Sequence, residues 1–385
     1  MPDPAPPTRP APLGRRAAPA GPLLADHDEG SLAELLARAG AAPSAARAAA
    51  RRAIRHVFPA DRDAPPAGPD AHQGAPLTAR WDAGALAALE IGAWAHPALL
   101  ALSPDVSLSV AELAPSSDET LRLVLRARDG ALIEAVVIPG PARATLCLSS
   151  QVGCARACTF CETGRLGLDR QLSAGEIVDQ VRIARRVWRG AAPLQNLVFM
   201  GMGEPFDNLG EVLRAIRLLT DPGAFAFAPK RVTVSTVGVI DKLDAFFRGA
   251  RAELAVSLNA PDDARRLPIM PINARFPLAA LKEALARALP PRRRVLFEYV
   301  LFDRYNDAPE DADLLAAYVA GIRCRVNVIP SNPGPDPRLR PPPPERLDAF
   351  VARLSGHGVT TLVRRPRGRD VGGACGQLAG RARVA

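Results

Sequence analysis

The sequence predicts an α/β protein whose main part is a partial (βα)6 barrel, preceded by a small helical domain and a short β extension. From Ala144 onward, six short apolar segments typical of strands alternate with six helical stretches. This alternation indicates parallel strands joined by crossover helices. Six such units favour a partial barrel over a flat doubly wound sheet. Short polar signatures follow the strands, at the end where a barrel carries its active site.

The part of the chain before the β extension divides into two segments. Residues 1–30 are rich in Pro, Ala and Gly and have little to bury, so we expect a disordered tail. Residues 31–100 carry apolar residues at helical spacing and are expected to form a small helical accessory domain. Ser31 is the expected N-cap of its first helix, and Glu34 completes a capping box.

The rest of the chain contains strands throughout. Residues 101–143 hold three strand-like segments joined by polar turns and form the β extension. Residues 144–385 form the barrel and a C-terminal loop that carries a cysteine. The barrel strands are predicted at ATLCLSS, LQNLVFMG, RVTVSTVG, ELAVSLNA, VLFEYVLF and CRVNVIPS. The helices are predicted to begin near Ser173, Leu209, Val239, Leu278, Glu310 and Glu345.

The composition excludes some classes of protein. Of the 385 residues, 48% are hydrophobic and 23% are charged, which fits neither a wholly disordered chain nor a membrane bundle. There is no run of about 18 apolar residues and no recognisable secretory signal, so we expect a cytoplasmic protein without a membrane partner. The net charge of +9 is almost all arginine. An anionic partner explains this charge, and a genome biased toward arginine explains it equally well.

Three cysteines lie close together in a loop after the first predicted barrel strand. Cys154, Cys158 and Cys161 have the spacing C-x3-C-x2-C. Three thiolates at this spacing suit an iron–sulfur cluster better than a tetrahedral zinc site, which usually has two paired ligand sets. In a [4Fe–4S] cube with three protein ligands, one iron stays open for another ligand. The alternatives are a structural zinc site or three buried thiols.

The cysteine motif, with Phe160 just before the last cysteine, resembles that of the radical S-adenosylmethionine (SAM) superfamily. The stretch TLCLSSQVGCARACTFCETGRLGLDRQLSAGEI, followed by FMGMGEPFDN, PIMPIN and ACGQLAG, resembles the RlmN/Cfr family of RNA adenosine methyltransferases. This resemblance covers residues 134–380. It implies a radical-SAM barrel and a [4Fe–4S] cluster bound by the three cysteines. It also implies that SAM binds the open iron, with two molecules used per turnover.

The resemblance places SAM against particular residues. It puts Gly203 and Glu204 at the methionine moiety, where a glycine lets the cofactor approach the backbone and a carboxylate can pair with its ammonium group. The other implied cofactor contacts are Ser235, Ser257, Leu258, Asn259 and Asn332. Asn259 departs from the family pattern, which commonly has His there, so this position has no titratable side chain.

The resemblance also implies three catalytic residues. Cys375 accepts a methyl group, Cys147 later forms a disulfide with Cys375, and Glu134 is a general base. The chemistry explains the need for two thiols: the amidine carbon of adenine is electrophilic, so a carbon radical can add to it, and the resulting bridge to the protein must then be broken. The alternatives without the resemblance are a small buried residue for Cys375, which its neighbouring glycines disfavour, a buried strand residue for Cys147 and an exposed strand carboxylate for Glu134.

The implied substrate is RNA. Family members methylate C2 or C8 of an adenosine in 23S rRNA, and some C2 enzymes also act on tRNA; LLTDPGAF, GRLGLDRQL and PIMPINARFP are somewhat more similar to C8-type members. The arginine clusters at 292–294 and 364–369 could contact phosphates. The second cluster is preferred because it precedes Cys375. The N-terminal helices occupy the place of the family's small RNA-binding domain.

Two other functions fit parts of the sequence. A radical activase or maturase would keep the cluster and act on protein, and it would need neither Cys147 nor Cys375. A zinc-bearing RNA-binding module would have no catalytic activity. A radical enzyme also needs a reducing partner, such as flavodoxin or ferredoxin.

Overall fold

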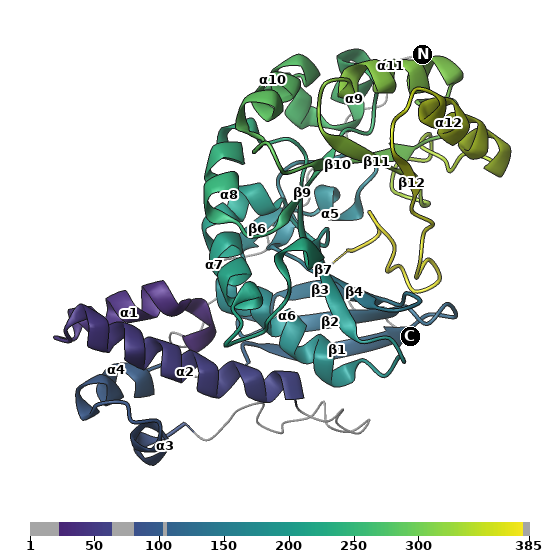
Figure 1. Ribbon diagram of the computed structural model, residues 1–385. Helices are drawn as coiled ribbons and strands as arrows, with labels where there is room; N and C mark the ends of the chain where they lie inside the picture. Colours follow the sequence, from purple (N-terminus) through teal and green to yellow (C-terminus); the bar gives the residue numbers. More distant parts are fainter. Residues whose placement is uncertain (1–22, 64–80, 103–105, 380–385) are drawn as a thin grey trace.

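The computed structural model describes residues 23–63, 81–102 and 106–379 (Figure 1). A ten-stranded sheet forms its centre, with an antiparallel part that leads into a parallel part. Helices cover the outer side of the parallel strands, and the N-terminal helices lie together at one end of the molecule. This is the predicted α/β architecture, with an antiparallel β extension before the parallel strands. Within the described ranges, no helix is both long and apolar enough to cross a membrane.

The N-terminal domain is helical, as predicted, but its first helix begins earlier than expected. Its helices are α1 (Glu29–Arg38), α2 (Pro43–Asp63), α3 (Ala83–Ala88) and α4 (His96–Leu100). The predicted N-cap is wrong, because Asp28 caps α1: its Oδ1 accepts a hydrogen bond from the Ser31 backbone N at 2.8 Å, and Ser31 Oγ accepts one from Asp28 N at 3.1 Å. Asp and Ser are both good N-caps, and the capping box forms between these two residues.

The end of the predicted tail is ordered. Residues 24–26 form a short 3-10 helix in which Leu24 and Ala25 are buried. Asp26 Oδ1 accepts a hydrogen bond at 3.0 Å from the backbone N of Gly175, in the first turn of α6 (Ala174–Val187). This contact attaches the start of the helical domain to the barrel. Residues 1–22 lie outside the described residues.

The β extension is continuous with the barrel. Its strands β1 (Leu108–Pro115), β2 (Leu121–Ala127) and β3 (Leu132–Ile138) are antiparallel, and β3 pairs with β4 (Ala144–Cys147), the first barrel strand. Val136 lies opposite Cys147. Because alternate residues of a strand share a face, Glu134 and Cys147 lie on the same face of this sheet.

All six predicted barrel strands and their helices are present. After β4 come β7 (Leu194–Phe199), β8 (Val232–Thr236), β9 (Glu253–Ser257), β10 (Val295–Leu301) and β11 (Cys324–Pro330), all parallel. The helices after α6 are α7 (Leu209–Thr220), α8 (Leu243–Gly249), α9 (Asp263–Ile269), α10 (Leu278–Ala288), α11 (Pro309–Val319) and α12 (Pro344–Gly356). A further short strand, β12 (Thr361–Val363), pairs in parallel with β11 and was not predicted.

A two-stranded hairpin follows β4 and was also not predicted. Its strands, β5 (Gln151–Cys154) and β6 (Gly167–Gln171), enclose the cysteine loop and the short helix α5 (Glu162–Arg165). Gly153 has a φ of +76°, and a Cβ there would lie 1.9 Å from the carbonyl oxygen of Gly167. Only glycine therefore allows the two strands to approach this closely.

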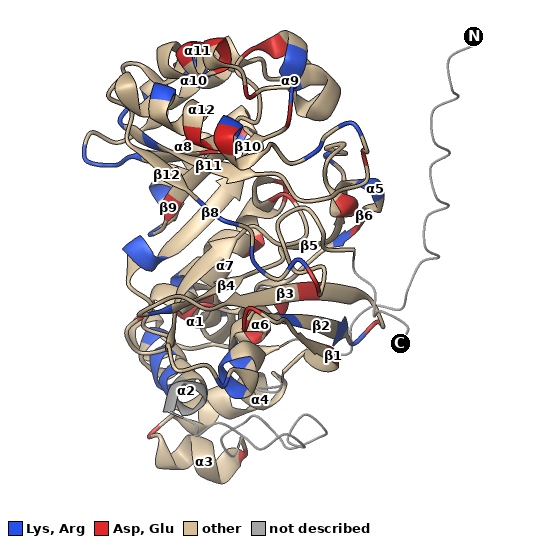
Figure 2. Ribbon diagram, turned by 90° about the vertical axis from the view of Figure 1, so that its right-hand side faces the viewer, with Lys and Arg blue, Asp and Glu red and all other residues tan. Residues whose placement is uncertain are grey.

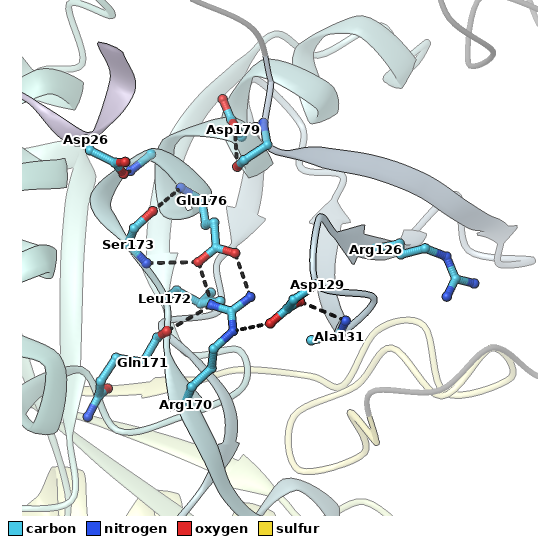
Figure 3. Close-up of polar contacts among 12 residues, drawn as sticks. Asp26, Arg126, Asp129, Ala131, Arg170, Gln171, Leu172, Ser173, Glu176 and Asp179 are labelled. Atoms are coloured by element: carbon cyan, nitrogen blue, oxygen red, sulfur yellow. Dashed lines mark hydrogen bonds and ion pairs between the residues drawn. The ribbon is translucent and has the colours of Figure 1, made fainter. Parts of the chain in front are cut away.

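Arg170 of β6 joins this hairpin to the main body of the protein (Figure 3). Its Nη1 and Nη2 each donate to one carboxylate oxygen of Glu176 on α6 at 2.8 Å, and its Nε donates to Asp129 Oδ2 at 2.7 Å. Asp129 lies in the turn between β2 and β3. One guanidinium thus connects the cysteine-bearing hairpin to a barrel helix and to the β extension.

Candidate active site

A cavity at the carboxyl ends of the barrel strands brings together most of the predicted site residues. We call it the cofactor cavity. Its wall includes the three clustered cysteines as well as the predicted residues Gly203, Glu204, Ser235, Ser257, Asn259 and Cys375. The position is the one expected for a βα barrel.

The three cysteines form part of one wall of this cavity. Cys154 ends β5, and the Cys161 backbone N donates to the Cys158 carbonyl at 3.1 Å. Burial raises the pKa of the Cys154 thiol to about 12 and also raises the pKa values of Cys158 and Cys161, and the neighbouring thiols add to the effect at Cys158. Buried thiols of this kind stay protonated unless a metal replaces the proton.

This donor set fits an iron–sulfur cluster. Within the described residues, no three His, Cys, Asp or Glu side chains are close enough together to hold a single metal ion. A [4Fe–4S] cube has a different requirement, because each thiolate binds a different iron. Three cysteines on one wall, facing a cavity with space for a further ligand, meet that requirement.

Glu204 faces the same cavity from the loop after β7. Its Oε1 accepts a hydrogen bond from Phe206 N at 3.0 Å and its Oε2 accepts one from Val237 N at 2.9 Å. The side chain is almost fully buried, and burial raises its pKa to about 7 despite these bonds. A carboxylate held in this way is a suitable partner for an ammonium group. Gly203 beside it has a φ of +102°, and a Cβ there would meet the Gln151 side chain at 2.6 Å.

Two predicted cofactor residues do not line the cofactor cavity. Leu258 is fully buried, and its backbone N donates to the Glu298 carbonyl at 2.9 Å. Asn332 lines a second cavity and donates from Nδ2 to the Cys375 carbonyl at 3.1 Å. Its Oδ1 accepts a hydrogen bond from Arg369 Nε at 2.8 Å. In this arrangement Asn332 supports the segment around Cys375.

The backbone conformation and the hydrogen bonds at position 259 explain why this residue is Asn. Its φ of +59° lies in the left-handed region, which Asn tolerates better than most residues. Its Oδ1 accepts a hydrogen bond from Val300 N at 2.9 Å, and its carbonyl accepts one from Asn306 Nδ2 at 2.8 Å. The side chain therefore fixes the end of β9 against β10. These hydrogen bonds need only an amide and a carbonyl group, so Asn259 can make them without a titratable side chain.

The two predicted catalytic cysteines lie around the second cavity, which we call the thiol cavity. Cys375 and Cys147 both line it, and Cys375 also lines the cofactor cavity. Both are free thiols. Burial raises the pKa of Cys147 to about 12, and Cys375 contributes to the shift. The structure therefore places one thiol between the two cavities and the second thiol beside the thiol cavity.

Cys375 belongs to an irregular segment, residues 368–379, that we call the strap. One end is attached to the turn between β1 and β2, where the Gly368 backbone N donates to Asp118 Oδ2 at 3.0 Å. The other end lies against the cysteine loop: the Glu162 backbone N donates to the Gly376 carbonyl at 2.8 Å, and Thr163 Oγ1 donates to the Leu378 carbonyl at 2.6 Å. Both attachments fix the position of Cys375.

Glu134 lies beneath the end of the strap and lines neither cavity. Its side chain is fully buried. Its Oε1 accepts a hydrogen bond from Ala379 N at 3.1 Å, and its Oε2 accepts one from Arg122 Nη1 at 3.2 Å. The alternative interpretation of Glu134 as an exposed strand carboxylate is wrong, because the strap covers this face of β3.

The two arginine clusters occupy different places. Residues 292–294 precede β10 and so lie at the amino-terminal end of that strand, away from the cavities. Arg365 and Arg367 are exposed and line the thiol cavity, whereas Arg364 lines both cavities. Basic residues are also present on the N-terminal helices and elsewhere around the barrel (Figure 2).

Glu298 also lines the cofactor cavity and was not predicted as a site residue. It is 4% exposed, and both carboxylate oxygens accept hydrogen bonds from Asn327 Nδ2, at 3.1 and 2.9 Å. The available signal in the sequence was one acidic residue inside the apolar segment VLFEYVLF. A charged group within a buried strand needs a partner or a function.

Comparisons with known proteins agree with this site. Residues 148–316 match the radical SAM superfamily. The chain is 77% identical over 363 residues to a probable RNA methyltransferase, sce1580, of Sorangium cellulosum, with 94% of this chain and 88% of the relative covered. This protein belongs to the RlmN/Cfr family of radical SAM RNA methyltransferases.

Other relatives support the same assignment. The dual-specificity RNA methyltransferase RlmN of Syntrophobacter fumaroxidans is 46% identical over 273 residues, covering 71% of this chain and 80% of the relative. A crystal structure of a radical SAM methyltransferase from Sphaerobacter thermophilus has a TM-score of 0.78 and 36% identity, covering 94% of this chain and 100% of that one. The protein is thus an enzyme of the RNA methyltransferase type. Its superfamily implies a [4Fe–4S] cluster and SAM.

Proposed function

We propose that this RlmN/Cfr-family enzyme methylates C2 or C8 of an adenosine in RNA through a methylated Cys375. The target to test first is 23S rRNA, and tRNA is the second. The observation that carries the proposal is the pair of thiols, Cys375 and Cys147, on the wall of one cavity that adjoins the cysteine-lined cofactor cavity. A protein-directed activase would have no use for this pair.

The cofactor cavity has suitable groups for both cofactors. Cys154, Cys158 and Cys161 would hold the cluster, and Glu204 would pair with the ammonium group of SAM. Ser235, Ser257 and Asn259 complete the polar part of the wall. Together with an electron from a flavodoxin or ferredoxin, the bound cofactors supply a 5′-deoxyadenosyl radical.

In the proposed reaction, Cys375 and Cys147 have different roles. Cys375 takes a methyl group from one SAM molecule and, after a second SAM molecule has provided the radical, presents the carbon that adds to the adenine ring. The radical would take a hydrogen atom from this methyl group, and the adduct with the ring would lose one electron to the cluster and the ring proton to a base. The Cys147 thiolate would then attack the Cys375 sulfur: the S–S bond forms, the bond from this sulfur to the added carbon breaks, and the carbon keeps the electron pair and takes a proton to complete the methyl group of the released base. Two SAM molecules are used per turnover. Glu134 would transfer a proton only after Ala379 has moved, because its carboxylate is occupied in the described arrangement.

The RNA would approach Cys375 from the thiol cavity. Arg365 and Arg367 are exposed at this cavity and can contact the phosphates on either side of the target nucleotide. The helical N-terminal domain, joined to α6 through Asp26, provides a second surface for RNA. Phosphate contacts position the substrate and do not by themselves choose the base.

The test is nucleoside mass spectrometry of 23S rRNA after anaerobic incubation with reconstituted enzyme, reductant and methyl-deuterated SAM. Labelled 2-methyl- or 8-methyladenosine is expected, and it identifies the carbon. Cys375→Ala should abolish labelling, and Cys147→Ala should leave RNA covalently attached to the protein. Full activity in both variants would refute the mechanism. Absence of label in both 23S rRNA and tRNA, from enzyme that cleaves SAM, would refute the proposed substrate.

A further inference from the structure

Arg364 differs from the other arginines of its cluster in the cavities that its side chain lines. Its backbone N donates to the Val328 carbonyl at 3.0 Å and so continues the pairing of β12 with β11. Arg364 is half-buried and lines both cavities, whereas Arg365 is exposed and lines the thiol cavity but not the cofactor cavity. Its place on the wall of the cofactor cavity gives Arg364 access to groups that Arg365 and Arg367 do not reach.

The guanidinium of Arg364 lies among acidic and sulfur-containing groups. Its Nη1 is 3.2 Å from the Met200 Sδ, and Met200 also lines both cavities. The pKa of Arg364 is raised above its usual value, first by Cys375, then by Glu298 and Cys147, although burial opposes the shift. This half-buried cation thus lines the cofactor cavity together with the Glu298 carboxylate and Cys375, and lines the thiol cavity together with Cys375 and Cys147.

Glu298 lines the cofactor cavity together with Arg364, and its carboxylate is held in place. Two hydrogen bonds from Asn327 orient its carboxylate. Burial raises the pKa of Glu298, whereas the charge of Arg364 and the bonds from Asn327 lower it. A guanidinium has five N–H donors in a rigid fork, so it can serve a carboxylate and a thiolate at the same time.

We propose that Arg364 is a positioning residue for Cys375: sharing the cofactor cavity with Glu298 and Cys375, it provides the counter-charge for the Cys375 thiolate and directs this sulfur toward the methyl donor in that cavity. The inference rests on the proposed function, in which Cys375 is the methyl acceptor. The reaction is a displacement. After the thiol has lost its proton to solvent, a thiolate lone pair forms the new S–C bond, the bond from the methyl carbon to the sulfonium breaks, and its electron pair remains on the departing sulfur.

This arrangement also explains how the methylated side chain can leave its first position. A thiolate is attracted to Arg364, but the thioether formed by methylation is neutral. Methylation therefore removes the attraction to Arg364, while the Glu298 carboxylate stays on the same cavity wall as the guanidinium. Cys375 is then free to turn toward the thiol cavity, which it also lines.

The test measures the reactivity of Cys375 without any methyl transfer. Anaerobic holoenzyme, in which the cluster protects its ligand cysteines, is treated with iodoacetamide at about pH 7.5, where reactivity follows the thiolate fraction. Peptide mass spectrometry then gives the alkylation rates of Cys375 and of Cys324, a thiol remote from both cavities that serves as the internal reference. We expect Arg364→Met to slow alkylation of Cys375 about tenfold relative to Cys324, and Arg364→Lys to change it less than about threefold.

The matched control is Arg365→Met, which removes an exposed neighbouring charge and should leave this ratio close to that of the wild type. If Arg364→Met does not fold or load iron, Arg364→Gln serves as the second neutral variant. A wild-type alkylation ratio in a folded neutral variant would overturn the inference. Transfer of a deuterated methyl group to Cys375 of the wild-type enzyme, measured separately, tests the proposed function itself, so the two failures can be told apart.

Discussion

The Glu134 carboxylate and the backbone N of Ala379 form a hydrogen bond of 3.1 Å across 245 positions of the chain. This bond joins the β extension to the end of the strap that carries Cys375. The same carboxylate is held from the other side by Arg122, whose Nη2 also donates to Glu112 Oε1 at 2.7 Å. The β extension therefore helps to set the position of a proposed catalytic thiol.

Two substitutions of Glu134 separate its contact with the strap from its proposed proton transfer. Glu134→Gln keeps an oxygen that can accept from Ala379, so hydrogen exchange of the strap amides should stay within about twofold of the wild type. Methylation should fall about 100-fold, because the amide cannot act as a base. Glu134→Ala should also speed hydrogen exchange of the strap amides, because Ala379 N loses its acceptor. It should lower the free energy of unfolding by about 3 kcal/mol, because Arg122 loses a buried partner. Wild-type methylation in Glu134→Gln would assign this residue a structural role alone.

Asn259→Ala tests the structural explanation for the missing histidine. The variant loses the acceptor for Val300 N and places alanine in the left-handed region, where Asn is better tolerated. Together these effects should lower the free energy of unfolding by about 2–3 kcal/mol, which a thermal shift of the holoenzyme would detect. The pH profile of methylation should keep its shape. A changed profile with unchanged stability would contradict this account.

The sequence predicted the barrel well because its strands are continuous apolar segments. It missed β12 because Thr361–Val363 is short and largely exposed, so burial leaves no signal in its composition. Without this strand, the four consecutive residues Arg-Arg-Pro-Arg resemble one basic surface, and the sequence does not single out Arg364. The pairing with β11 places Arg364, but not Arg365, on the wall of the cofactor cavity.

Contacts between distant segments could not be predicted from local patterns. Glu298 was missed because no local feature shows that Arg364 and Asn327 lie beside it. The burial of Glu134 was missed for the same reason, since a strap 245 positions away covers it. The cysteine motif was recognised because its ligands are close together in the sequence as well as in space.

Arg170→Ala should loosen the hairpin that carries the cysteine loop. The substitution leaves the carboxylates of Glu176 and Asp129, which are 8% and 4% exposed, without their shared cation. We expect a loss of about 2–3 kcal/mol and faster release of iron to a chelator. Arg165→Ala, which removes an arginine of the same hairpin whose side chain is 59% exposed, is the control and should release iron at the wild-type rate. Equal rates in all three proteins would show that the Arg170 contacts do not support the cluster site.

Replacement of the clustered cysteines distinguishes an iron–sulfur enzyme from a zinc-bearing module. The wild type, purified without oxygen and reconstituted, should hold about four iron atoms per chain and absorb light at about 400 nm. Cys154→Ser, Cys158→Ser and Cys161→Ser should each lose most of this iron, because a hydroxyl is a poor ligand beside two thiolates. Cys324→Ser and Cys375→Ser change thiols outside the motif and should keep the iron. Since formation of the radical depends on the cluster, zinc in a colourless wild-type protein would contradict the radical mechanism, whatever the roles of Cys375 and Cys147.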